Sequence, residues 1–190
     1  SLDGLWKTIV DPFENGYYDY RRLPLKKGGY GDDVEYIDRT KLQEYDFATD
    51  RTLYVPGDWN TQRPELYYYE GTVWYRNRFM YEVKTDKRIF LHFGAVNYEA
   101  IVFLNGKEIG QHIGGFTPFN FEVTGLLKNG ENSLVVKVDN KRKFEAVPTV
   151  NSDWWNYGGI TRQVTLIETQ KTFVRDYYIE LYKRVEGLEK

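Results

Sequence analysis

An acidic residue stands among aromatic rings in the run Asp153-Trp154-Trp155-Asn156-Tyr157 of this 190-residue chain. Indole and phenol rings can pack on the apolar C–H face of a pyranose, and a carboxylate can accept protons from its hydroxyl groups. We therefore take Asp153, Trp154, Trp155, Asn156 and Tyr157 as candidate sugar-binding residues. Residue types alone leave a second interpretation open, in which the indoles only cap a hydrophobic core.

Cleavage of a glycosidic bond needs two carboxyl groups about 5–10 Å apart, one as acid and one as nucleophile or base. Asp153 supplies one carboxylate, and the sequence nominates no partner for it. Glu65, Glu70, Glu99 and Glu145 are each expected to be surface charges. The residues by themselves therefore indicate sugar binding and assign no catalytic group.

Other chemistries find little support in the sequence. There is no cysteine, no phosphate-binding Gly-rich loop with Lys-Ser/Thr, and no Gly-x-Ser-x-Gly motif. His92 and His112 lack cysteine partners and close spacing, so we expect structural roles for both. Asp32-Asp33 is expected to be a solvated acidic loop, since no calcium-binding loop pattern surrounds it. We predict neither a metal nor a cofactor.

Composition and charge limit the classes of molecule that the chain is expected to bind. The net charge of −2 and the isoelectric point near 5.8 argue against a nucleic acid or an anionic membrane, which would require a basic surface. No stretch approaches the roughly 20 apolar residues of a membrane span. Tyrosine outnumbers phenylalanine, 17 to 11, which suggests rings that are partly in water, although half-buried tyrosines on sheets would explain most of them. The compartment stays open.

Short alternating apolar runs separated by turn residues predict an all-β fold, an antiparallel sandwich or barrel. Asn105-Gly106 predicts a hairpin with a type I′ turn. Residues 11–50 look irregular, with an exposed loop at 28–33 and a turn of helix at 42–47. About nine strands are expected, at 1–10, 53–55, 71–80, 89–93, 100–104, 107–111, 134–138, 161–167 and 173–181. In the third of these, Trp74, Arg76, Arg78 and Met80 are expected on the wetter face.

Several blocks in the chain resemble, in order, the amino-terminal sugar-binding domain of glycoside hydrolase family 2, nearest the β-glucuronidases and next the β-galactosidases. The resemblance covers roughly residues 1–182, leaving 183–190 as a linker to a following domain. It implies a jelly-roll (galactose-binding-like) antiparallel β-sandwich. The blocks are Leu53–Asn60, Tyr69–Arg76, Phe93–Val96, Val102–Gly106, Gly114–Phe119 and Asp153–Val164.

The resemblance also implies a role for the acidic run. In that family an immunoglobulin-like sandwich and a TIM barrel follow, and the barrel holds both catalytic glutamates. No Asn-Glu pair of the kind that carries the acid/base glutamate occurs here, so the chain alone is expected not to hydrolyse glycosides. Asp153 matches the aspartate that reaches into the barrel's pocket and binds sugar hydroxyls. Asn156, Tyr157 and Arg162 match residues that look loop-fixing. Trp154 and Trp155 stand where the glucuronidases usually have two phenylalanines.

Two alternatives accompany this reading. The chain could be a free-standing carbohydrate-binding module or lectin that binds sugar through Trp154 and Trp155. It could also serve a structural role, because this domain often contributes to subunit contacts in the family, which makes a homo-oligomer one of the implied partners. For such enzymes, export to a bacterial periplasm or secretion is compatible with the resemblance.

Overall fold

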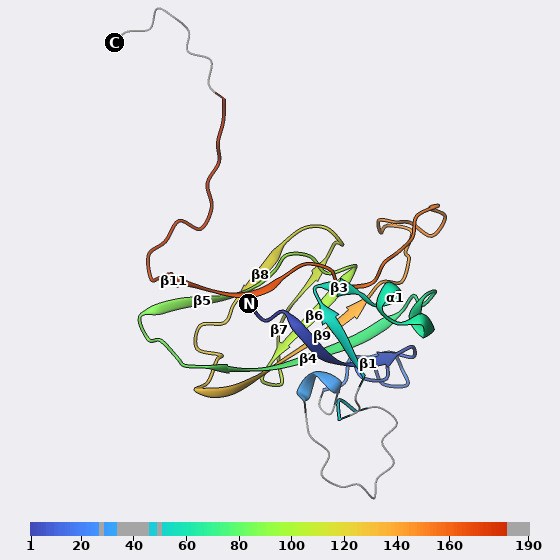
Figure 1. Cartoon of the computed structure of the whole chain (residues 1–190), viewed down its shortest axis with the longest axis horizontal. Helices are drawn as coiled ribbons and strands as arrows, with labels where there is room; N and C mark the ends of the chain where they lie inside the picture. The colour runs from blue at the N-terminus through green and yellow to red at the C-terminus, as the bar shows by residue number, and fades with distance from the viewer. Residues whose placement is uncertain (27–28, 34–45, 49–50, 182–190) are drawn as a thin grey trace, which may run out of the picture.

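The structure, a computed structural model, describes residues 1–26, 29–33, 46–48 and 51–181. Two layers of β-sheet face each other across a hydrophobic core (Figure 1). Eleven strands lie in the described residues: β1 Gly4–Asp11, β2 Thr52–Val55, β3 Gly57–Asp58, β4 Thr72–Tyr81, β5 Lys87–Phe93, β6 Glu99–Leu104, β7 Lys107–Ile113, β8 Phe119–Glu122, β9 Gly130–Asp139, β10 Gly159–Ile160 and β11 Val164–Gln170.

The larger layer is a six-stranded sheet in the order β2-β1-β4-β9-β6-β7. The smaller layer is a three-stranded sheet in the order β11-β5-β8, and β10 pairs with β3 beside it. All the paired strands run antiparallel. The predicted all-β antiparallel sandwich is confirmed.

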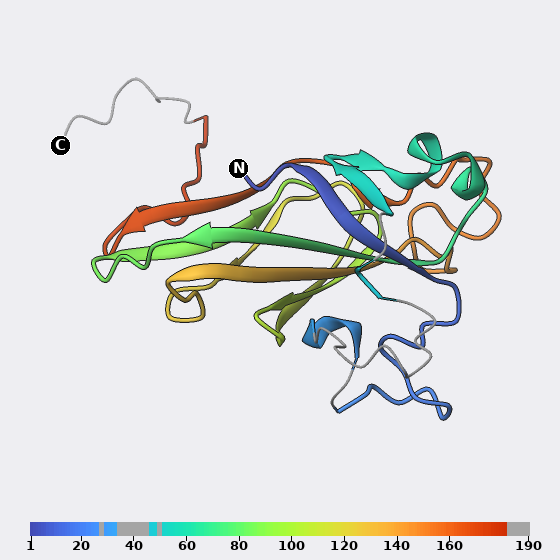
Figure 2. The same ribbon diagram turned by 60° about the horizontal axis from the view of Figure 1, so that its bottom comes forward.

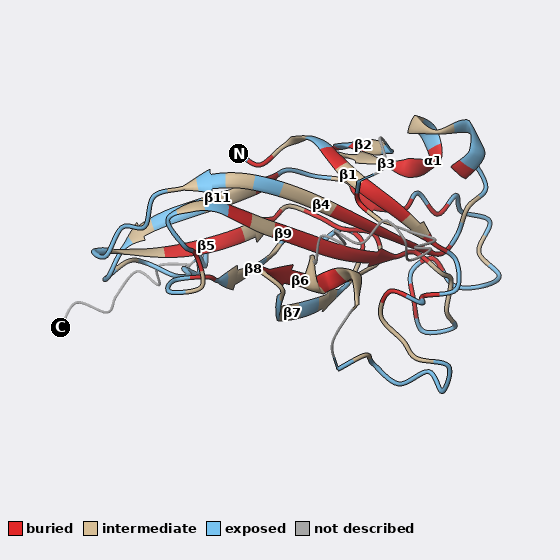
Figure 3. Ribbon diagram, turned by 90° about the horizontal axis from the view of Figure 1, so that it is seen from below, coloured by how far each residue is buried: buried red, intermediate tan, exposed pale blue. Residues whose placement is uncertain are grey.

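Alternation along the strands sends one set of side chains into the space between the layers. Ile89, Leu91 and Phe93 of β5 are buried there, as the sequence predicts, opposite residues of β4 and β9 such as Val73 and Val136. Figure 3 shows this buried band running along the strands of both layers. Its removal from water is the main stabilisation of the sandwich.

Part of the outer face of the six-stranded sheet is also buried, contrary to the prediction for Trp74, whereas Arg78 and Met80 on the same face of β4 are exposed as predicted. Trp74 of β4, expected on the wetter face, has no exposed surface and packs with Ile9, Val135 and Phe103 from neighbouring strands. Phe47, from the irregular segment before β2, completes this second cluster. Figure 2 shows the described residues between β1 and η1 lying beneath this sheet, so an irregular segment takes the place of solvent there.

The predictions of an exposed loop at 28–33 and of a solvated acidic Asp32-Asp33 are wrong over the described residues 29–33, for the same reason. Tyr30–Asp32 forms a short 3₁₀ helix, η1, against the sheet. The Asp33 side chain is only 7% exposed and accepts a hydrogen bond from Arg76 of β4 at 2.8 Å. A carboxylate that leaves water needs such a partner. The predicted turn of helix at 42–47 falls largely outside the described residues.

The Asn105-Gly106 hairpin is confirmed, because β6 and β7 pair across it and both residues have positive φ, 52° and 78°. Two short helices, α1 Trp59–Gln62 and η2 Pro64–Leu66, follow β3 at one end of the sandwich. Within the described residues no helix is long and apolar enough to cross a membrane.

The end of the chain differs from the prediction. The strand expected at 161–167 begins later, as β11 at Val164, because the amides of Thr161 and Arg162 donate to the carbonyl of Ala95; the short strand β10 comes before the predicted range. The strand expected at 173–181 is absent: these residues leave the body as an extended chain (Figure 1). Val174 and Ile179 are about four-fifths exposed, 79% and 82%. Alternation makes a strand only where a neighbouring strand accepts its hydrogen bonds. Residues 183–190 lie outside the described part.

Candidate functional site

The loop between β9 and β10 carries the acidic run on the surface of the sandwich. Asp153 is exposed, and among the described residues its carboxylate has no hydrogen bond or ion pair. Trp154 is 61% exposed and Trp155 is 37% exposed. The two indoles therefore do not cap the core, and the carboxylate beside them is free to meet a ligand.

A patch of aromatic rings surrounds Trp155. Its ring centroid lies 4.9 Å from that of Tyr67, 5.5 Å from that of Tyr68 and 6.0 Å from that of Tyr157. Tyr67 and Tyr68 follow η2, far from Trp155 in the sequence, and all four rings of this aromatic patch are exposed in part. Sequence reasoning missed Tyr67 and Tyr68, although the run of three tyrosines at 67–69 was a visible signal.

Polar side chains form the base of the aromatic patch. A small pocket of about 100 Å³ lies there, lined by Asn60, Tyr67, Tyr68, Glu70, Arg142, Trp155 and Asn156. Arg142 donates from Nε to Glu70 at 2.8 Å. Its two terminal nitrogens donate to the carbonyls of Ser152 and Trp154, at 2.8 and 2.6 Å. The pocket combines rings with hydrogen-bonding groups, the mixture that sugars require.

Asn156 lies inside the loop, with 5% exposure. Its side-chain amide donates to the carbonyl of Asn140, and its side-chain oxygen accepts from Asn97 at 3.0 Å. Asn140 in turn donates to the carbonyl of Asn156 at 2.8 Å. These contacts give Asn156 a loop-fixing position. Direct contact between Asn156 and a sugar stays a prediction.

Two glycines bring the end of the loop against the core. A Cβ on Gly158 would lie 2.0 Å from the ring of Trp59, and one on Gly159, at φ +143°, would lie 2.6 Å from the carbonyl of Gly57. The amide of Gly158 donates to the side-chain oxygen of Asn60 at 2.9 Å. Asn60 also donates to the carbonyls of Leu66, Tyr67 and Tyr69. The buried side chain of Asn60 therefore joins the turn at residues 66–69 to the β9–β10 loop.

Arg162, matched to a loop-fixing residue, is exposed and donates to the carbonyl of Phe116 at 3.3 Å. That contact ties the segment between β10 and β11 to the loop before β8. The four glutamates considered as partners for Asp153 behave as charges at the surface. Glu65, Glu70 and Glu99 form ion pairs with Arg63, Arg142 and Lys143, and Glu145 is exposed.

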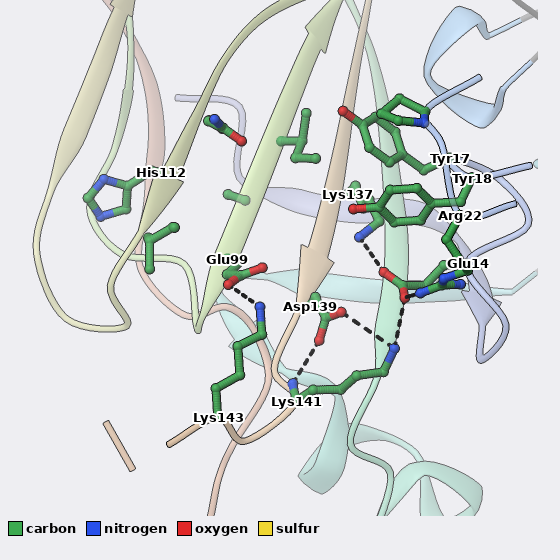
Figure 4. A pocket seen from close by; sticks show the side chains of 15 residues that line it. Glu14, Tyr17, Tyr18, Arg22, Glu99, His112, Lys137, Asp139, Lys141 and Lys143 are labelled. Carbon is green, nitrogen blue, oxygen red and sulfur yellow. Dashed lines mark hydrogen bonds and ion pairs between the residues drawn. The ribbon is translucent and has the colours of Figure 1, made fainter. Parts of the chain in front are cut away.

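A larger pocket, about 420 Å³, opens on the outer face of the six-stranded sheet (Figure 4). Four cationic side chains line it, and each has a carboxylate partner. Lys137 and Lys141 donate to Glu14 at 2.9 and 3.1 Å, as does Arg22, while Lys143 donates to Glu99. Sequence reasoning missed this cluster, because its members are far apart along the chain.

Glu14 is the centre of that cluster. Burial raises the pKa of its carboxyl group, but the bonds and charges of Lys137, Arg22 and Lys141 outweigh it and lower the pKa to about 2. The bonds from Lys137 and Lys141 to Glu14 hold residues 14–22 against the sheet. His112, also in this pocket, stacks on Phe119 with centroids 4.1 Å apart, and burial lowers its pKa.

Within the described residues, no group of three or more histidine, aspartate or glutamate side chains could hold a metal ion. The β9–β10 loop combines aromatic rings with hydrogen-bonding side chains. One free carboxylate stands beside exposed rings, above a base held by asparagine amides and an arginine.

Comparison with known proteins assigns the chain to a family. Residues 1–170 match the model of glycosyl hydrolases family 2, sugar binding domain. A putative β-glucuronidase of Formosa agariphila is 34% identical over 141 residues, covering 72% of this chain and 17% of that protein. A β-galactosidase of Thermoanaerobacter pseudethanolicus is 34% identical over 119 residues, covering 60% of this chain and 16% of that protein.

Comparison with solved structures gives the same family. The β-glucuronidase of an uncultured Clostridium species superposes with a TM-score of 0.66 at 34% identity, covering 89% of this chain and 28% of that one. This chain thus spans less than a third of the length of the relatives it matches.

Proposed function

The chain belongs to glycosyl hydrolase family 2, as a sugar-binding domain of the β-glucuronidase and β-galactosidase kind, and on that basis we propose its part in a larger enzyme. In this proposal the domain is not itself catalytic. It forms one wall of an active site whose reacting carboxylates lie on a following barrel domain, and Asp153 binds hydroxyl groups of the substrate sugar. An immunoglobulin-like domain would connect the two.

The observation that carries the proposal is the state of Asp153. Its carboxylate is exposed and unpartnered among the described residues, while the residues around it are anchored by Arg142, Asn140 and Asn156. Glu70, the carboxylate that lines the pocket beside Trp155, is bound to Arg142 at 2.8 Å. An acid held in position with its bonding capacity unused suits the recognition of hydroxyl groups by another molecule.

The role of Asp153 is expected to appear in turnover as well as affinity. Only an interaction that is stronger in the transition state raises the rate. Loss of a charged hydrogen bond to a hydroxyl group costs about 1.5–3 kcal/mol, which corresponds to about a 10- to 150-fold drop in kcat/KM. The test is Asp153→Ala in the complete protein that carries this chain, assayed with nitrophenyl β-glucuronide and β-galactoside.

The matched control is Asp86→Ala, which removes an exposed aspartate from the β4–β5 turn and should leave kcat/KM unchanged. A change below about 0.5 kcal/mol for Asp153→Ala would contradict the proposal. The 190-residue chain alone should give no turnover. Turnover that disappears on Glu→Gln changes within this chain would show that the domain is catalytic.

The exposed rings favour a second candidate, a free-standing carbohydrate-binding module. In that case the 190-residue chain itself binds glucuronides, galactosides or mannosides, with a midpoint in the millimolar range or tighter. Titration followed by tryptophan fluorescence would respond in the unmodified chain and lose its response on Trp155→Ala. A flat titration across all three sugar classes would leave the active-site role as the better account.

A further inference from the structure

We propose that Arg142 is the positioning residue for Asp153, a role that rests on the proposed function of that carboxylate. Its guanidinium bonds the main chain on both sides of Asp153. One terminal nitrogen donates to the carbonyl of Ser152 at 2.8 Å and the other to the carbonyl of Trp154 at 2.6 Å. These are the residues immediately before and after Asp153, so the main chain is held on both sides of it.

Holding both neighbours determines the direction in which the Asp153 side chain leaves the main chain. The planar guanidinium suits this task, because its nitrogens are fixed relative to one another and donate in parallel. A lysine ammonium is a point charge on a flexible stem and cannot hold two carbonyls in the same rigid way. We call the two bonds from Arg142 to the carbonyls of Ser152 and Trp154 the clamp. Arg142→Lys therefore keeps the positive charge and removes the clamp.

Arg142 is itself held from the opposite side. Its Nε donates to Glu70 at 2.8 Å, and Glu70 precedes Gly71, whose amide donates to the side chain of Asn140 at 2.8 Å. The guanidinium thus joins the segment before β4 to the loop after β9. The Arg142 side chain is 22% exposed, which limits competition from water for these bonds.

The clamp prepares the site in advance. The bonds of Arg142 go to main-chain carbonyls on either side of Asp153, and the Asp153 carboxylate itself stays unpartnered among the described residues. A group held in its working position loses less conformational freedom when the ligand binds. Arg142 therefore acts through Asp153 and does not need to touch the sugar.

A double-mutant cycle in the complete protein tests this dependence, with nitrophenyl β-glucuronide and β-galactoside as probes. We expect Arg142→Lys to lower kcat/KM about 10- to 100-fold, since misplacement of a positioned group by about 1 Å has effects of that size. In the Asp153→Ala background the same change should cost less than about threefold, because the group that it positions is gone. Arg88→Lys breaks a comparable bidentate pair, with Glu122 on the far sheet, and should have no effect.

The 190-residue chain gives a second readout that is independent of activity. Trp154 and Trp155 are cleavage sites for chymotrypsin, and cleavage at exposed Tyr177 in the extended end provides an internal rate reference. Arg142→Lys should speed cleavage after residues 154 and 155 by about tenfold relative to Tyr177, as the loop opens locally. Glu70→Gln should act in the same direction and more weakly, which covers the case in which Arg142→Lys folds poorly.

The outcomes separate the two proposals. If Asp153→Ala leaves kcat/KM intact, the proposed function of that carboxylate is wrong. If Asp153→Ala impairs the enzyme but Arg142→Lys does not, or if the two losses multiply, Arg142 does not act through Asp153. Unchanged cleavage of the loop in Arg142→Lys would also overturn the clamp.

Discussion

Asn140 and Asn156 each donate a side-chain hydrogen bond to the other's main-chain carbonyl. Asn140 Nδ2 lies 2.8 Å from the oxygen of Asn156, and Asn156 Nδ2 bonds the oxygen of Asn140. Both side chains are buried, at 0% and 5% exposure. This reciprocal pair closes the base of the loop that carries Asp153, because the two residues stand where the loop leaves and re-enters the sandwich.

Asn156→Ala is expected to lower the free energy of unfolding by about 1–3 kcal/mol, because the buried carbonyl of Asn140 and the amide of Asn97 lose a partner. Urea unfolding followed by circular dichroism measures the change. Asn151→Ala removes the same side chain from an exposed position of the same loop and should stay within about 0.5 kcal/mol of the unmodified chain. Equal effects of the two substitutions would show that the pair contributes nothing specific.

Gly158→Ala is expected to destabilise the domain by about 1–3 kcal/mol through overpacking. The added methyl group would meet the ring of Trp59, which is fully buried. Thermal unfolding would report the change, and Gln163→Ala, at an exposed position on the same segment, is the control. A melting temperature equal to that of the control would mean that Trp59 can shift without cost.

Glu14→Gln is expected to change how stability depends on pH. The folded pKa of Glu14, about 2, lies below its ordinary value of 4.5, so its contribution is fully present above about pH 5 and is lost as the pH falls toward 2. A shift of this size corresponds to about 3 kcal/mol. The variant should be less stable than the unmodified chain at pH 7, and the difference should shrink below pH 3.

Urea unfolding at several pH values would trace the two curves for Glu14. Glu82→Gln changes an exposed glutamate and should reproduce the curve of the unmodified chain. A constant gap between Glu14→Gln and the unmodified chain from pH 7 to pH 2 would be incompatible with a lowered pKa at this carboxyl group.

Tyr75→Phe is expected to raise the free energy of unfolding by about 1 kcal/mol, because the Tyr75 hydroxyl is buried with no hydrogen-bond partner in the described structure. Burial and the charge of Asp58 raise the pKa of Tyr75, so the hydroxyl is neutral at every working pH. Tyr69→Phe is the matched control: its hydroxyl donates to the carbonyl of Thr72 at 2.9 Å and its loss should destabilise by about 1 kcal/mol. The same sign for both variants would contradict the prediction.

The local sequence pattern was sufficient to predict the structure where a single face of a sheet packs on the core. Alternation predicted that Ile89, Leu91 and Phe93 point inward, and Asn105-Gly106 predicted its hairpin, because backbone geometry and the nearest neighbours decide both. The same reasoning failed for Trp74 and Asp33. Whether the second face of a sheet meets water depends on where a distant segment lies, and no periodicity within the strand reports that.

The strand predicted at 173–181 failed for a related reason, since pairing requires an edge that the residues themselves do not encode. The sequence by itself determined the fold class, the family and the identity of Asp153 as the candidate acid, because these follow from residue types in order along one chain. Only the tertiary structure brought Tyr67, Tyr68, Glu70 and Arg142 to the loop that carries that acid. The contacts of Tyr67 and Tyr68 with Trp155, and of Glu70 with Arg142, join residues more than 70 positions apart, and such distances close only when the two sheets pack and bury their shared core.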